Sequence, residues 1–154
     1  MNNFAKALVL FVVAFHAAIF VVEAFLWMHP AVYEFALNRL AIKTTLDLPG
    51  QALVLQASFV NQGFYNLFLA SAGIAGLVFL GRGNAPVGYT LIVYMCLSAL
   101  GAGLVLATST PATIGAILQG VPAAIALAAM LPRLLSGLSP LTARSRGTRR
   151  ADIS

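Results

Sequence analysis

The chain is short of charge. Of its 154 residues only 8% are Asp, Glu, Lys or Arg, whereas about a quarter of the residues of a typical soluble domain are charged. Acidic residues are the scarcest, with four Asp and Glu in all, and 60% of the residues are hydrophobic. This balance excludes an ordinary soluble domain and is typical of an integral membrane protein.

Cysteine and histidine are also scarce, with one cysteine and two histidines in the chain. The single cysteine, Cys96, lies in an apolar segment, so neither a disulfide framework nor a cysteine metal cluster can form. Of the two histidines, His29 falls at the expected membrane edge, which argues against a two-histidine haem site. One buried histidine and one glutamate are too few ligands for a metal ion. We therefore predict no metal and no cofactor.

The few charges are unevenly placed, although their formal sum is +5. Four arginines lie between residues 144 and 150, in a short tail after the last apolar run. A basic patch beside a membrane end is a topology signal and a contact for anionic lipid. The expected partners are therefore membrane lipids, and no nucleic acid is expected.

Long apolar runs, by contrast, are plentiful. They cover residues 7–28, 51–80, 87–107 and 112–135. Each can cross a hydrocarbon layer of about 30 Å, which needs about 20 helical residues. Residues 31–42 alternate apolar and polar side chains, which predicts a short interfacial helix. The predicted fold is an all-α integral membrane protein: a four-helix transmembrane bundle over residues 1–135 with a short interfacial helix after the first span, followed by a basic, disordered tail over 136–154.

Four spans place both termini on one side of the membrane. That side carries seven basic residues, namely Lys6, Arg82, Arg133 and the four arginines of the tail, and the other side carries Arg39 and Lys43. Basic residues concentrate on the cytoplasmic side of membrane proteins. We therefore expect both termini in the cytoplasm and a location in the bacterial inner membrane.

The second apolar run contains a stripe of polar residues. On a helix its members fall within an arc of roughly 140°; they are Ser58, Asn61, Gln62, Tyr65 and Asn66. In lipid, such side chains need hydrogen-bond partners or a wet cavity. The stripe therefore marks either a helix-packing interface or a site.

Polar residues of the other spans are expected at the same depth, between the midplane and the outer leaflet. They are His16, Glu23 and Trp27 on the first span, Tyr94 and Ser98 on the third, and Gln119 on the fourth. His16 and Glu23 lie on one face about 10 Å apart along the axis, too far for a direct hydrogen bond. They would flank a substrate or bond separately to the stripe.

Three groups of residues resemble a known pattern. They are His16 with Glu23 and Trp27, the segment 61–66 followed by Leu69-Ala70, and the segment 119–123. Together they are similar to a small family of bacterial membrane proteins known as domain of unknown function 1304, over about residues 5–135. The resemblance implies a four-helix integral membrane protein and no established activity.

The leading hypothesis is an enzyme whose lipophilic substrate enters the bundle from the membrane. Glu23 would donate or accept the proton and His16 would be its counterpart. The chain has no nucleophile motif, phosphate loop or metal cluster, which favours isomerisation, cyclisation or epoxide opening of a terpenoid-like molecule. The predicted substrate-binding residues are Trp27, Ser58, Asn61, Gln62, Tyr65, Asn66, Tyr94, Ser98 and Gln119.

Two other classes of function remain open. The same residues suit a binding or transport protein that recognises a small solute or couples proton movement through Glu23 and His16. Four helices are few for a transporter, so this alternative needs a homo-oligomer. In the third hypothesis, the polar stripe docks a partner protein and the chain is a structural subunit.

Overall fold

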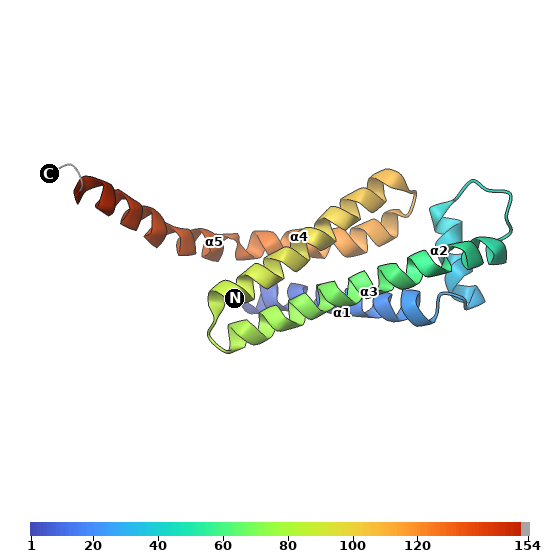
Figure 1. Cartoon of the computed structure of the whole chain (residues 1–154), viewed down its shortest axis with the longest axis horizontal. Coiled ribbons are helices and arrows are strands. Elements are labelled where there is room, and N and C mark those ends of the chain that lie inside the picture. Colours follow the sequence, from blue (N-terminus) through green and yellow to red (C-terminus); the bar gives the residue numbers. More distant parts are fainter. Residues whose placement is uncertain (152–154) are drawn as a thin grey trace.

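The computed structural model describes the backbone of residues 1–151 and the side chains of residues 1–136. Its elements are five helices, and the described residues contain no strand (Figure 1). The helices are α1 (Asn3–Phe25), α2 (Pro30–Leu40), α3 (Leu48–Gly81), α4 (Ala85–Ser109) and α5 (Thr113–Ala151). Helices α1, α3, α4 and the part Thr113–Ser136 of α5 are long and apolar enough to cross a membrane. The predicted fold class is therefore confirmed.

Short polar segments and prolines begin the helices. The side chain of Asn2 accepts a hydrogen bond from the backbone N–H of Ala5 at 2.8 Å, and that of Asp47 accepts one from Gly50 at 2.9 Å. Helices α2, α3 and α4 each have a proline in their first turn, where its missing N–H has no intrahelical role. Helix α3 begins at Leu48, three residues before the apolar run that starts at residue 51, because Asp47 caps it.

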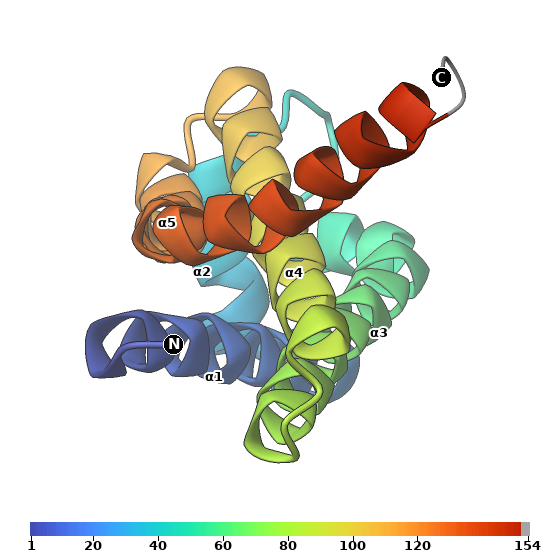
Figure 2. The same cartoon turned by 90° about the vertical axis from the view of Figure 1, so that its left-hand side faces the viewer.

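The four long helices form a ring (Figure 2). Helix α1 packs against α3 and α5, and α4 packs against the same two helices from the opposite side. Helix α2 packs against α3 at one end of the bundle (Figure 1). We call this the outer end, and the end that holds the α3–α4 turn the inner end.

Helix α4 approaches its two neighbours at different ends. Near the inner end it is tight against α3, where a Cβ on Gly76 would lie 2.9 Å from the carbonyl oxygen of Gly88. Near the outer end it is tight against α5, where a Cβ on Gly103 would lie 2.9 Å from the Cα of Gly120. Glycines allow this close approach of backbones in membrane bundles. Helix α4 therefore leans from α3 toward α5 along its length.

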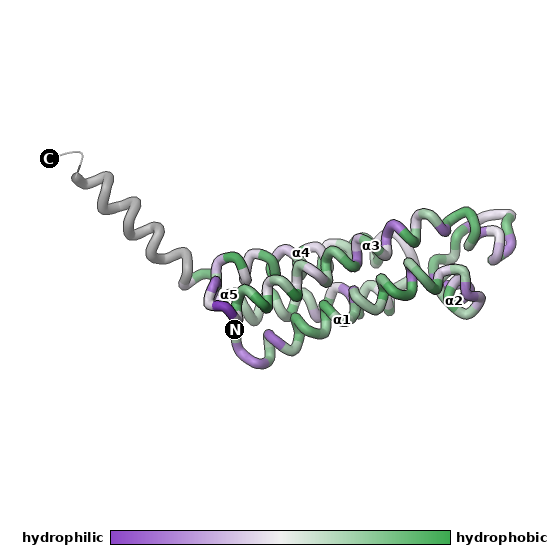
Figure 3. Tube along the Cα trace, turned by 60° about the horizontal axis from the view of Figure 1, so that its bottom comes forward, coloured by the Kyte–Doolittle hydropathy of each residue, from purple (hydrophilic) through white to green (hydrophobic). Residues whose placement is uncertain are grey.

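Two clusters of buried residues hold the fold together. The larger lies inside the ring and contains Val9, Val12, Ile92, Met95 and Met130 with several alanines. The smaller lies at the outer end, where α2 meets α3, and contains Trp27, Tyr33, Leu37 and Ala52. Apolar residues also cover the outside of the bundle, while polar residues gather at its ends (Figure 3). This distribution suits helices surrounded by lipid.

The basic tail falls largely outside the described side chains. The backbone of α5 continues as helix to Ala151, so the boundary predicted at residue 136 does not coincide with a helix end. The disorder predicted for residues 136–154 stays a prediction, and residues 152–154 lie outside the described part of the chain.

Candidate functional site

Glu23 and Asn66 meet between α1 and α3. The Asn66 Nδ2 donates a hydrogen bond to Glu23 Oε2 at 2.9 Å and a second to the backbone carbonyl of Gln62 at 3.1 Å. Asn66 is only 6% exposed and Glu23 is half-buried. The carboxyl group of the first span is therefore held by an amide of the polar stripe, as one of the sequence hypotheses required.

Gly63 brings the two helices close enough for this bond. A Cβ on Gly63 would lie 3.0 Å from the backbone nitrogen of Ala24 and 3.2 Å from the Cβ of Glu23. Asn66 follows Gly63 by three residues, so both lie on the same face of α3. The short segment 61–66 thus combines a glycine that permits helix contact with an amide that reaches the carboxyl group.

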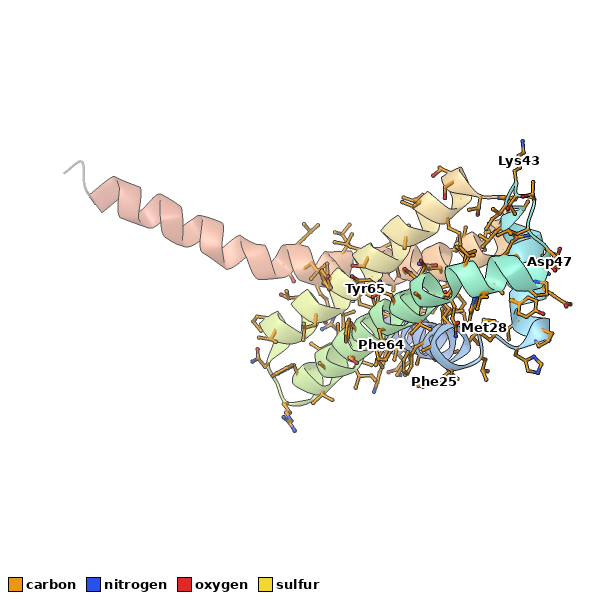
Figure 4. All side chains as sticks on the ribbon, turned by 45° about the vertical axis from the view of Figure 1, so that its right-hand side comes forward. Phe25, Met28, Lys43, Asp47, Phe64 and Tyr65 are labelled. Carbon is orange, nitrogen blue, oxygen red and sulfur yellow. The ribbon has the colours of Figure 1, made fainter. Side chains whose placement is uncertain are left out.

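Aromatic rings lie beside this pair. The Phe20 ring packs edge-on against Phe25, with ring centroids 5.3 Å apart, and against Phe64 across the helix pair, at 5.4 Å. Phe25 and Phe64 are exposed on the outside of the bundle, where α1 and α3 run together (Figure 4). An apolar surface therefore adjoins the carboxyl group on the side that faces lipid.

The register of α3 against α1 sets how far its residues lie below the outer end. Trp27, just beyond the end of α1, stacks on Phe59 with ring centroids 3.6 Å apart, so the bundle reaches its outer end near Phe59 rather than at Gln51. The first turns of α3 extend past α1 and pack against α2. Measured from Phe59, Asn61 is only about 3 Å deep and Asn66 about 10 Å, while Glu23 is about 6 Å below Trp27.

Only one member of the stripe is turned inward. The other four members, Ser58, Asn61, Gln62 and Tyr65, are exposed. Tyr65 projects away from the interior of the bundle (Figure 4). The buried face of α3 instead follows Gly63, Asn66, Ala70 and Gly73. Asn66 lies at the edge of the predicted arc, and that edge is the one that α1 covers. The four exposed residues keep the substrate-binding role only as a prediction.

His16 lies in the centre of the bundle and is fully buried. Its Nδ1 is 2.8 Å from the carbonyl oxygen of Val12 and donates to it, because a carbonyl can only accept. The Nε2 therefore carries a lone pair, and it has no hydrogen-bond partner among the side chains of residues 1–136 or the described backbone. His16 remains about 10 Å from Glu23 along the helix, so the structure does not bring the two predicted acid/base residues together.

The remaining predicted residues are spread over the bundle. Trp27 is 2% exposed, and its Nε1 donates to the carbonyl oxygen of Ala52 at 2.9 Å, so it ties the end of α1 to α3. Ser98 on α4 and Gln119 on α5 are half-buried. Tyr94 is 61% exposed. The next residue, Met95, packs against Gly73 of α3, so Tyr94 is level with Gly73. Tyr94 therefore belongs to the inner half, away from Glu23.

Sequence reasoning missed the contributions of Gly63 and Phe64. Both had been seen within the segment 61–66, but only its polar residues were assigned to the site. The available signal was a glycine three residues before an asparagine in an apolar helix, which is the spacing of a helix-packing face. The aromatic side of the site had no signal, because phenylalanines occur throughout the spans.

The arrangement is suited to proton transfer. One oxygen of Glu23 accepts from a neutral amide, and no ion pair to this carboxyl group occurs within residues 1–136. A neutral donor fixes the orientation of a carboxyl group without a permanent counter-charge. Among the described side chains, no three His, Cys, Asp or Glu residues gather as metal ligands would.

Comparison with known families gives one result. The profile of a family described as protein of unknown function (DUF1304) matches residues 10–131, which include Glu23, Gly63 and Asn66. The resemblance predicted from the sequence is thereby confirmed. No curated protein and no solved structure matches the chain.

Proposed function

We propose that this chain, which belongs to the DUF1304 family, is a membrane-embedded enzyme that transfers protons to and from a lipophilic substrate. Glu23 is the acid/base group, and Asn66 orients it. The observation that carries this proposal is the hydrogen bond of 2.9 Å between the Asn66 amide and the Glu23 carboxyl group inside an apolar bundle.

The cost of placing Glu23 in the bundle supports a function for it. Ionisable groups within membrane spans are energetically unfavourable and occur mainly at functional sites. A carboxyl group with a purely structural role would be stabilised better by several hydrogen-bond donors or by a cation. Glu23 receives a single described hydrogen bond from a side chain. Its second oxygen, Oε1, is the atom that can meet a substrate.

The surroundings indicate the class of substrate. Phe20, Phe25 and Phe64 provide an apolar surface next to the carboxyl group, and Glu23 lies about 6 Å below Trp27 along the helix axis. A molecule that lies in the outer part of the membrane can therefore place a double bond or an epoxide at Oε1. The carboxylic acid would donate its proton there, and the carboxylate would recover a proton from a neighbouring carbon, as in isomerisation, cyclisation or epoxide opening of a terpenoid-like molecule.

A second function is favoured by one observation. The buried Nε2 of His16 has no hydrogen-bond partner in the described part of the chain, and buried polar atoms normally have one. In a proton-coupled binding or transport protein, His16 and Glu23 would carry protons at two depths of the same helix. This alternative predicts changed uptake of a solute on deletion, with an unchanged lipid composition.

Untargeted lipid analysis tests the proposal directly. Membranes of cells that lack the protein are compared with membranes of the same cells that express it from a plasmid. We expect a lipophilic compound to accumulate without the protein and an isomer of it to return with expression. Identical lipid profiles in the two strains, under conditions in which the protein is produced, would reject the enzyme.

The proposed location is the bacterial inner membrane with both termini in the cytoplasm. The seven basic residues on the terminal side against two on the other support this orientation. A reporter that is active only in the cytoplasm should work when fused after Ser154, and a periplasmic reporter should work when inserted beside Asp47. Activity of the two reporters in the opposite compartments would reverse the orientation and place Glu23 in the cytoplasmic half.

A further inference from the structure

The lean of α4 opens a groove between α4 and α5 near the inner end. The two helices are in backbone contact at Gly103 and Gly120, but toward the inner end α4 follows α3 instead. The space that this leaves between α4 and α5 is a groove of about 630 Å³ that is open on one side. It lies in the opposite half of the bundle from Glu23 and plays no part in the proposed proton transfer.

The groove is polar at one end and apolar along its length. Arg133 of α5 lines it together with Tyr89 and Thr90, which lie near the start of α4. Val93 and Leu97 line it further along α4. From Ala85 to Leu97 the groove follows α4 for about 18 Å, which is close to half of a hydrocarbon layer of about 30 Å. Its length is therefore that of one leaflet.

Arg133 supplies a positive charge at the end of the groove. It is exposed, and within residues 1–136 it forms no ion pair with a carboxylate. The acidic residues of that part of the chain are Glu23, Glu34 and Asp47, which all lie in its outer half. A guanidinium group binds phosphate through two parallel hydrogen bonds, and residues 1–136 offer Arg133 no carboxylate in its place.

We propose that the α4–α5 groove binds one anionic phospholipid of the leaflet at the inner end. Its phosphate pairs with Arg133, and one acyl chain lies along Val93 and Leu97. The Thr90 hydroxyl donates to the carbonyl of Pro86 at 2.9 Å, so its oxygen remains available to accept from a hydroxyl of the headgroup. Charge, apolar lining and length all fit a lipid, whereas a soluble phosphate would use only the arginine.

Native mass spectrometry of the purified full chain tests this site. The protein is supplied with phosphatidylglycerol or with phosphatidylcholine of the same acyl chains, in the same detergent. We expect wild-type protein to retain phosphatidylglycerol preferentially and Arg133→Gln to lose this preference by about tenfold, as for one charge-assisted contact. The matched control is Arg82→Gln, which removes a charge of the same sign in the α3–α4 turn, outside the groove.

Two further measurements distinguish a lipid seated in the groove from a phosphate held by charge alone. Thr90→Trp fills the groove while Arg133 stays in place, and it should reduce the retention of both lipids. Glycerol 1-phosphate, which has the charge without the chain, should not raise the thermal stability of the wild-type protein as phosphatidylglycerol does. Equal lipid preference in wild type and Arg133→Gln, an equal loss in Arg82→Gln, unchanged retention in Thr90→Trp, or equal stabilisation by glycerol 1-phosphate would each overturn the proposal.

Discussion

The Glu23→Gln variant is expected to form product roughly 10²–10⁴-fold more slowly than the wild type, which is the usual loss when a general acid or base is removed. Glutamine keeps the shape of the side chain and can still accept the hydrogen bond that Asn66 donates, but its amide does not act as an acid or a base near neutral pH. A neutral amide is also cheaper to bury than a charge. The variant should therefore insert and fold in amounts similar to the wild type.

Two variants of α3 show whether the effect is specific. Asn66→Ala removes the bond that orients Glu23 and should slow product formation less than Glu23→Gln does. Gln56→Ala removes an amide of the same helix that is exposed, does not bond to Glu23 and is not among the predicted substrate-binding residues, so its activity should match the wild type. Product per folded molecule is measured by lipid analysis of complemented cells, with the folded amount taken from size-exclusion profiles of the same membranes.

The opposite pattern would assign Glu23 a structural role. In that case Glu23→Gln would reduce the yield of folded protein, and the surviving molecules would have normal activity. Normal activity per folded molecule in this variant excludes Glu23 from the chemistry, whatever the yield. It would leave His16 as the remaining candidate for proton transfer.

The Gly103→Ala variant is expected to destabilise the bundle by about 1–3 kcal/mol, the usual cost of overpacking a tight interior. A Cβ at this position would lie 2.9 Å from the Cα of Gly120 and 3.0 Å from the carbonyl oxygen of Ala116. Both atoms belong to the backbone of α5, so no side-chain rotation can relieve the contact. The two helices would have to move apart along their outer halves.

Gly101→Ala is the matched control for this prediction. Gly101 lies two residues earlier on the same helix, and a Cβ there would meet no atom within 4 Å. Alanine is preferred over glycine in helix interiors by about 0.5–1 kcal/mol, so this variant should be as stable as the wild type or slightly more so. Thermal unfolding in one detergent compares all three proteins. Equal loss of stability in both variants would contradict a backbone contact between α4 and α5 at Gly103.

Much of the architecture was predictable because a bilayer constrains it strongly. A hydrocarbon layer needs about 20 apolar residues per helix, so the long apolar runs identified α1, α3, α4 and the first part of α5. Backbone groups in lipid must bond internally, so each run had to be helical. The alternating pattern of residues 31–42 likewise predicted α2. The apolar runs differ from the helices at their ends: the second run starts at residue 51, whereas α3 begins at Leu48, where Asp47 caps it.

The candidate site was predictable only in part. Glu23 stood out because a carboxyl group is rare in a membrane span, and the stripe on α3 stood out because amides are. Which edge of that stripe faces α1 could not be read from helical periodicity, since an arc of residues does not say which neighbour covers it. Gly63 allows α1 to pack closely against the face of α3 that contains Gly63. Asn66 lies on this face and Asn61 does not, so Asn66 is the residue that bonds to the carboxyl group.

Thus the sequence by itself determined the number of spans, the helix between the first two and the family, since these depend on hydrophobic length, local periodicity and residue motifs. Only the tertiary structure decided the depth of each polar residue, because α3 is longer than α1 and overhangs it to pack on α2. It also decided the lean of α4, because the glycine contacts that pull this helix toward α3 at one end and α5 at the other join residues far apart in the chain. The depth of a polar residue and the lean of α4 both depend on how one helix packs against another, and the residues of one helix alone do not specify them.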